Sequence, residues 1–202
     1  MTATSVPAVL LLADGTVTHG RALGAMGTTT GEICFNTGMT GYQEVFTDPS
    51  YFGQILIMNS AHIGNYGVKD GDVESNSVKI NGLIGRNLED QYSRKMANGS
   101  LNDYLKTNKI VSIEGVDTRA LVAHVRTKGA MNCIISSETT DIALLKKKLA
   151  ETPDMEGLEL ASRVSTKEAY ELGDRNASIR IAVMDYGIKR NILTCKVKSG
   201  AF

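Results

Sequence analysis

Tryptophan is absent from this sequence of 202 residues, prolines and cysteines number three each, and neither sign of charge is in excess. With 22 basic and 22 acidic residues, the chain has no surplus of positive charge to displace counterions from DNA or RNA, so we expect no nucleic-acid partner. No apolar run approaches membrane-spanning length, and the N-terminus lacks the basic start and apolar stretch of a signal peptide. We therefore expect a cytoplasmic protein with no membrane partner.

The three cysteines are far apart and show no paired metal-ligand spacing, so we expect no metal site in this chain. An odd number of cysteines without a secretion signal indicates reduced thiols. Cys34 and Cys133 lie in apolar runs, which predicts small buried side chains. A nucleophilic pair of either cysteine with His62 could form only through the fold and stays an alternative. No glycine-lysine loop for phosphates is present, so we expect no ATP or other cofactor here.

Short apolar or alternating runs bounded by turn residues predict β-strands. The first two runs are separated by Asp14-Gly15, a tight-turn pair that predicts a hairpin. The run at 55–58 is apolar throughout, which indicates a strand buried on both faces. The predicted strands span residues 9–12, 16–20, 32–35, 55–58, 78–84, 110–113 and 131–136.

Capping residues before periodic apolar stretches predict three helices in the second half of the chain. Ser100 precedes a short helix, and Asp117 or Thr118 begins a second helix that Gly129 ends. The third helix begins at 139–141, and we expect its lysines 146–148 to form a solvated face rather than a binding patch.

The pattern changes after Pro153, where residues 153–178 have the polar, glycine-containing composition of a linker. Residues 179–184 then predict a strand, followed by a helix from near Ile188 to Gly200. A strand this apolar needs neighbours at its edges and helices on its faces, and none follows before Phe202. We therefore expect that residues 179–202 are the start of a second, truncated domain.

Residues 35–50 combine polar and small residues more densely than a packed core requires, which indicates a built loop of the kind that carries binding groups. Within it, Glu44 and Asp48 could form an acid–base pair, or they could cap turns and meet basic residues at an interface. His62 and Asn65 could bind a ligand or only structure their loop. Asp117 is expected to cap its helix, with Arg119 pairing locally.

The most specific strings of the chain are Phe35-Asn-Thr-Gly-Met-Thr-Gly-Tyr-Gln-Glu44, Thr47-Asp-Pro-Ser-Tyr51, His62-Ile-Gly-Asn65, Asp117-Thr-Arg119 and Asp185-Tyr-Gly-Ile-Lys-Arg-Asn-Ile-Leu193. In this order they resemble the small, glutamine-handling subunit of carbamoyl phosphate synthetase, and the similarity runs through essentially the whole chain. The resemblance implies an α/β fold with two parts. Residues 1–152 would form a swivelling β/β/α-type layered domain with mixed sheets. After the linker 153–178, residues 179–202 would be the first strand and helix of a truncated, doubly wound glutamine amidotransferase domain.

In that family the small subunit hydrolyses glutamine with a Cys–His–Glu arrangement and delivers ammonia to the large synthetase subunit. The large subunit makes carbamoyl phosphate from bicarbonate and ATP, for arginine or pyrimidine synthesis, so ATP and metal ions are expected there. The resemblance thus implies two partners, the large subunit and L-glutamine. The catalytic residues would all lie beyond Phe202, because Cys195 does not match the family's strand-to-helix nucleophile elbow, and this chain alone should be inactive.

Ser50 is the one residue that carries over, because it matches a family serine that helps to bind glutamine. A serine hydroxyl can donate and accept, which suits the amide, ammonium and carboxylate of this substrate. The plainer interpretation is that Ser50 closes a turn with Asp48. Two other functions stay open: a non-catalytic binding and assembly module, and a self-contained hydrolase that uses Cys34 or Cys133 with His62.

Overall fold

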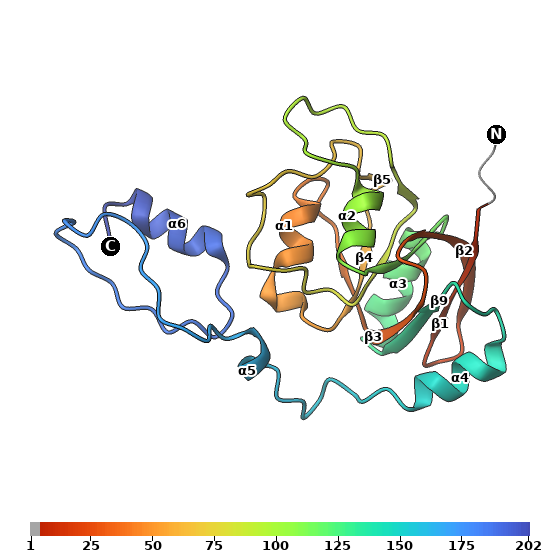
Figure 1. Ribbon diagram of the computed structural model, residues 1–202. Coiled ribbons are helices and arrows are strands. Elements are labelled where there is room, and N and C mark those ends of the chain that lie inside the picture. Colours follow the sequence, from red (N-terminus) through yellow and green to blue (C-terminus); the bar gives the residue numbers. More distant parts are fainter. Residues whose placement is uncertain (1–4) are drawn as a thin grey trace.

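The computed structural model describes residues 5–202 and has a closed, barrel-like sheet at its centre (Figure 1). The sheet has seven strands in the order β1-β2-β8-β6-β4-β3-β9. Strands β3, β4, β6 and β8 are parallel neighbours, and the remaining pairs are antiparallel, so the mixed α/β class is confirmed. The bounds are β1 Pro7–Leu12, β2 Val17–Gly24, β3 Thr28–Asn36, β4 Ile55–Met58, β6 Gly82–Ile84, β8 Val111–Glu114 and β9 Asn132–Ser136. A separate parallel pair joins β5 His62–Ile63 to β7 Asn87–Leu88.

Strands β4 and β6 are buried on both faces because side chains pack against the inside and the outside of the sheet, whereas β2 is only partly covered. Successive side chains of a strand point to opposite faces. In β4, Ile55 and Ile57 therefore belong to the core inside the sheet, while Leu56 and Met58 pack into a second core outside it. The prediction of a doubly buried strand at 55–58 is confirmed.

Four helices surround the sheet. α1 Tyr42–Thr47 and α2 Leu101–Thr107 contribute to the second core, whereas α3 Thr118–Lys128 shares the inner core with the strands. α4 Ile142–Ala150 covers β1 and β9 on another side, with its lysines 146–148 exposed. These helices bring apolar stripes to the sheet, which is the expected source of their stability.

The predicted helix caps are present. The Ser100 side chain accepts a hydrogen bond from the Asp103 N–H, and the Asp117 side chain accepts one from the Ala120 N–H, each at 3.1 Å. Gly129 ends α3 with a φ of 94°, a conformation that favours glycine. Arg119, however, forms no salt bridge among residues 5–202, so its predicted local pairing is wrong.

Two predicted strands differ from the structure. The strand expected over 78–84 is formed only at Gly82–Ile84. The strand expected over 179–184 does not form: within residues 5–202 this run makes one isolated bridge, from Ile179 to Ala201. Ile181 and Val183 are each 43% exposed, because no neighbouring strand or covering helix among the described residues buries them.

The C-terminal part is reached by an extended stretch after α4 that carries the chain to the opposite side of the molecule, next to α1 (Figure 1). It contains α5 Ala161–Val164 and α6 Arg190–Lys198. Gly187, with a φ of 102°, lies so close to the turn after α1 that a Cβ there would meet Pro49 at 3.2 Å and Val164 at 2.7 Å. The two parts of the chain therefore touch where residues 35–50 end.

Candidate functional site

Residues 35–50 are only partly a loop. Residues 37–40 are exposed, but helix α1 follows at Tyr42 and a single 3-10 turn, η1, spans Pro49–Tyr51. The prediction of a loop is wrong from residue 42 onward. Tyr42 and Phe46 lie four residues apart, which places both on one helix face, and both are fully buried in the second core.

Ser50 is an exposed residue that follows four buried ones, 46–49. Asp48 Oδ1 accepts the N–H of Ser50 at 2.9 Å, so the turn is closed through the backbone of Ser50 and not through its hydroxyl. Among residues 5–202, the Ser50 hydroxyl has no hydrogen-bond partner. Its oxygen is therefore free to donate to, or accept from, a small molecule at the surface.

Lys189 lies beside this turn, although sequence reasoning did not single it out. Its Nζ is 2.6 Å from Asp48 Oδ2, and the two side chains are 46% and 5% exposed. The hydrogen bond to the Asp48 carboxylate raises the pKa of Lys189. Residues 185–193 carry part of the family resemblance, which could have drawn attention to this segment. Nothing in the sequence, however, indicated which of its residues would reach Asp48.

Glu74 adds a second link between the two parts of the chain. Its carbonyl oxygen accepts the N–H of Arg190 at 2.9 Å, and its Oε2 accepts the N–H of Asn191 at 2.8 Å. We refer to residues 47–50, Glu74 and residues 187–191 together as the junction. The junction joins the turn that carries Ser50 to the N-terminus of α6.

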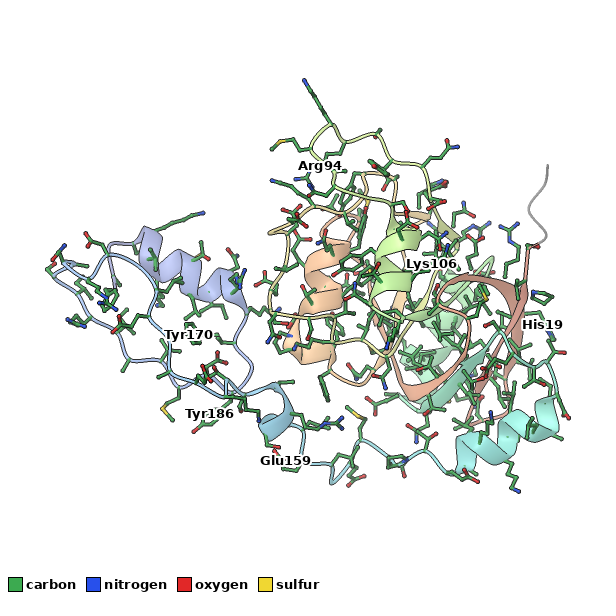
Figure 2. The ribbon with its side chains drawn as sticks, in the orientation of Figure 1. His19, Arg94, Lys106, Glu159, Tyr170 and Tyr186 are labelled. Carbon is green, nitrogen blue, oxygen red and sulfur yellow. The ribbon has the colours of Figure 1, made fainter. Side chains whose placement is uncertain are left out.

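The proposed acid–base pair of Glu44 and Asp48 is not what the structure contains. Asp48 binds Lys189, as the interface interpretation predicted. Glu44 lies in a different setting, where burial and the charges of Asp72 and Glu74 raise its pKa. Arg94 lies on the loop between β7 and α2 (Figure 2), and its positive charge partly offsets this rise in the pKa of Glu44. Arg94 Nη1 also donates to Asp72 Oδ2 at 2.7 Å.

His62 and the cysteines do not form a nucleophilic pair. His62 Nδ1 lies 2.8 Å from Glu89 Oε1 at the surface, and the Asn65 carbonyl accepts a bond from the Ser93 N–H at 3.1 Å, so this loop is structured by its own contacts. Burial raises the pKa of Cys34 to about 12 and raises that of Cys133 well above its usual value. Neither thiol is therefore poised to ionise near neutral pH.

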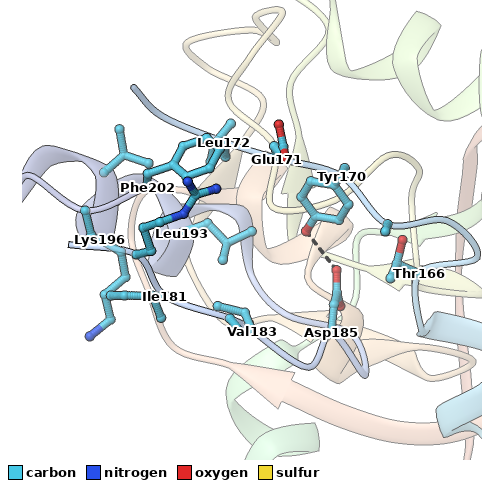
Figure 3. Close-up of a pocket in the computed structure, with 15 residues that line it drawn as sticks. Thr166, Tyr170, Glu171, Leu172, Ile181, Val183, Asp185, Leu193, Lys196 and Phe202 are labelled. Atoms are coloured by element: carbon cyan, nitrogen blue, oxygen red, sulfur yellow. Dashed lines mark hydrogen bonds between the residues drawn. The ribbon is translucent and has the colours of Figure 1, made fainter. Parts of the chain in front are cut away.

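A hollow of about 480 Å³ lies in the C-terminal part, between residues 166–172, residues 180–185 and α6 (Figure 3). Its lining mixes apolar side chains such as Leu172, Val183 and Leu193 with polar and charged ones. The Tyr170 hydroxyl donates to Asp185 Oδ2 at 2.9 Å, so two of its polar groups satisfy each other. This arrangement suits a packing surface better than a catalytic centre.

Two further kinds of feature are absent from residues 5–202. No helix there is both long enough and apolar enough to cross a bilayer. No three histidine, cysteine or acidic side chains in the same residues gather closely enough to hold a metal ion.

Comparison with known proteins identifies the relatives of this chain. Residues 10–135 match the family model described as "Carbamoyl-phosphate synthase small chain, CPSase domain". The carbamoyl phosphate synthase small chain of Thermotoga maritima is 47% identical, over 98% of this chain and 50% of the relative. The small chain of a Synechococcus strain is 46% identical, over 92% of this chain and 51% of the relative. The chain thus spans about half the length of the curated relatives it matches.

A solved aminopeptidase structure from an Aneurinibacillus strain overlaps 66% of this chain and 31% of its own, with a TM-score of 0.40 and 16% identity. Such a weak likeness supports no argument about function.

Proposed function

The chain belongs to the carbamoyl-phosphate synthase small-chain family, and from this membership we propose that it is the N-terminal part of a glutamine-dependent carbamoyl phosphate synthetase small subunit. The whole small subunit hydrolyses glutamine and passes ammonia to a large subunit, which uses ATP and bicarbonate to make carbamoyl phosphate. The product serves arginine or pyrimidine synthesis in the cytoplasm. ATP and metal ions bind to the large subunit, and this chain holds no cofactor.

One observation supports a role for this chain in the glutamine site. The Ser50 hydroxyl is exposed, has no partner among residues 5–202, and lies next to the C-terminal part at the junction. A ligand that sits between the two parts can therefore reach Ser50. Glutamine offers an amide, an ammonium and a carboxylate, and a hydroxyl can hydrogen-bond with any of them. Ser50 is in this proposal a substrate-binding residue and not a catalytic one.

The catalytic Cys–His–Glu group belongs, in this proposal, to the part of the small subunit that lies beyond residue 202. Cys34 and Cys133 have raised pKa values, and Cys195 is an exposed residue within α6 rather than at a strand-to-helix elbow. Residues 1–152 correspond to the family's swivelling layered domain, residues 153–178 to a linker and residues 179–202 to the start of the amidotransferase domain. The hollow beside α6 would then be covered by that domain.

The test uses a full-length small subunit, with the family's C-terminal half, together with the large subunit. Glutamine-dependent and ammonia-dependent carbamoyl phosphate synthesis are measured in parallel, and the 202-residue chain is assayed alone for glutaminase activity. We expect both activities from the complex and no glutamine hydrolysis by the chain alone. Turnover of glutamine by residues 1–202, blocked by thiol alkylation, would instead support the cysteine hydrolase.

A non-catalytic assembly module is the second candidate, and the raised pKa values of Cys34 and Cys133 favour it. A binding assay separates the two ideas. If the 202-residue chain binds the large subunit as tightly as the full-length small subunit does, then assembly is its intrinsic role. If binding requires the C-terminal half, the chain serves mainly to complete the glutamine site.

A further inference from the structure

The N-terminus of α6 has no cap of its own. Its N-cap residue is Lys189, whose side chain cannot accept a hydrogen bond, and the first turn of the helix contains no acidic residue. The first N–H groups of a helix have no partner within the helix and must be satisfied from outside. For α6 these partners come from a distant segment, the loop before β6.

Glu74 supplies both partners. Its carbonyl oxygen accepts the N–H of Arg190 at 2.9 Å and its carboxylate Oε2 accepts the N–H of Asn191 at 2.8 Å. A carboxylate at this place also interacts favourably with the partial positive charge of the helix N-terminus. One residue thus holds two consecutive N–H groups, which fixes the direction of the helix as well as its position.

The same residue is bound on its other side to the turn that carries Ser50. The Glu74 N–H donates to Thr47 Oγ1 at 2.9 Å, and the hydroxyl of the neighbouring Ser75 donates to the Thr47 carbonyl at 2.6 Å. Thr47 is 1% exposed, so this anchor belongs to the packed core. Ser50 follows three residues later.

We propose that Glu74 is a positioning residue for the glutamine site, because it joins the N-terminus of α6 to Thr47 and so sets the place of the C-terminal part relative to Ser50. This inference rests on the proposed function for its substrate. The ion pair of Asp48 with Lys189 is a single contact about which α6 could turn. The two hydrogen bonds to Glu74 remove that freedom. Glu74 does not contact the substrate in this proposal.

The structural half of the proposal is tested on the 202-residue chain by amide hydrogen exchange. In Glu74→Ala, we expect exchange at Asn191, whose N–H loses the carboxylate, to rise about fivefold, the change that corresponds to a helix cap worth roughly 1 kcal/mol. The N–H of Arg190 bonds to the backbone carbonyl of residue 74, which alanine keeps, so its exchange should rise less. Glu74→Gln keeps an acceptor oxygen and should recover most of the protection. Glu89→Ala, which removes another partly exposed carboxylate, is the matched control. Amides of β4 report whether the barrel itself stays folded.

Unchanged exchange at Asn191 in Glu74→Ala would overturn the proposal. If Glu74→Ala exposes the β4 amides as well, Glu74→Gln decides the matter, because it preserves the shape and the acceptor while removing the charge. Slower or unchanged exchange in β4 together with faster exchange in α6 supports the proposal.

The functional half uses the full-length small subunit in complex with the large subunit. Glu74→Ala should raise the KM for glutamine about fivefold while ammonia-dependent synthesis keeps its rate, and Glu74→Gln should restore most of the affinity. If Ser50→Ala raises this KM but Glu74→Ala does not, the positioning role fails and the proposed function stands. If neither variant changes the KM, the glutamine site itself has been placed wrongly.

Discussion

The carboxylate of Asp48 binds Lys189 Nζ through Oδ2 at 2.6 Å and the Ser50 N–H through Oδ1 at 2.9 Å. The two oxygens of one side chain therefore hold the C-terminal part of the chain and shape the turn that presents Ser50. The Asp48 side chain is only 5% exposed, whereas Lys189 is 46% exposed, so solvent partly screens the ion pair but not the hydrogen bond to Ser50. A change at Asp48 should therefore affect both the ion pair with Lys189 and the turn at Ser50. The choice of substitution can separate these two effects.

Asp48→Asn should loosen the C-terminal part while preserving the Ser50 turn, because asparagine keeps an oxygen for the Ser50 N–H but loses the charge that holds Lys189. Asp48→Ala should loosen the C-terminal part and also release the Ser50 turn. The added loss of the acceptor for the Ser50 N–H should lower the free energy of unfolding by about 1 kcal/mol. NMR shifts of the Ser50 and Ile188 amides, with urea denaturation, distinguish the variants. Identical behaviour of the two variants would contradict this division of roles.

The contact between Lys189 and Asp48 should persist at neutral pH and weaken only under strongly alkaline conditions. Because Asp48 raises the pKa of Lys189 in the folded chain, the stabilisation is complete below the pKa of the unfolded lysine, about 10.4. It is lost as the pH rises through the higher folded value. An NMR titration of the Lys189 side chain measures this midpoint. Asp48→Asn should shift the midpoint down, and an unmoved midpoint would show that Asp48 is not the cause.

Ser50→Ala should weaken glutamine binding in the full-length complex without harming the fold, because the hydroxyl makes no hydrogen bond among the described residues. The loss of one hydrogen bond should raise the KM for glutamine roughly two- to tenfold. Ammonia-dependent synthesis should be unchanged. Ser178→Ala, at another exposed serine, is the control and should behave as the parent does. An equal loss of ammonia-dependent synthesis would point to misfolding instead.

The three cysteines should differ sharply in their reaction with iodoacetamide. At mildly alkaline pH, Cys195 is exposed and should react, whereas Cys133 is fully buried and Cys34 has a pKa of about 12. The thiolate is the reactive form, so the half-buried Cys34 and the buried Cys133 should react only after unfolding. Mass spectrometry should therefore find one modification in the native chain and three in urea. Rapid native labelling of Cys34 would revive the hydrolase alternative.

Ile57→Ala should be among the most damaging single changes in the chain. Ile57 has no exposed surface and lies in the inner core of the sheet, so its truncation should cost about 2–5 kcal/mol of unfolding free energy. Met39→Ala, at a residue that is 78% exposed, should change stability by less than about 0.5 kcal/mol. Denaturant titration of both variants measures the difference. Equal losses of stability in Ile57→Ala and Met39→Ala would contradict the close packing of Ile57 in the inner core.

Local patterns predicted much of the fold. The Asp14-Gly15 turn, the buried strand at 55–58 and the caps Ser100 and Asp117 are all confirmed, because each depends on residues that are close together in the chain. The helix at 42–47 was missed because glycines at 38 and 41 and the surrounding polar residues resemble a loop. Only burial of Tyr42 and Phe46 against the second core makes the helix evident.

The strand predicted over 179–184 failed for the opposite reason. Its apolar alternation is a true local signal, but a strand also needs a neighbour with which to exchange backbone hydrogen bonds. Among the described residues only Ala201 meets Ile179 in a bridge. A local pattern indicates which secondary structure a segment favours. Whether a strand forms depends on a neighbouring strand with which it can pair.

For the candidate site the division is similar. The sequence by itself determined the family, the mixed α/β class and the place of Ser50 in a turn that Asp48 closes, because these depend on contiguous strings and short-range hydrogen bonds. Only the tertiary structure decided that the sheet closes on itself, and that Lys189 and the N-terminus of α6 meet Asp48 and Glu74. These contacts join residues more than a hundred positions apart, and their energies depend on burial and distance in three dimensions, which no spacing along the chain encodes.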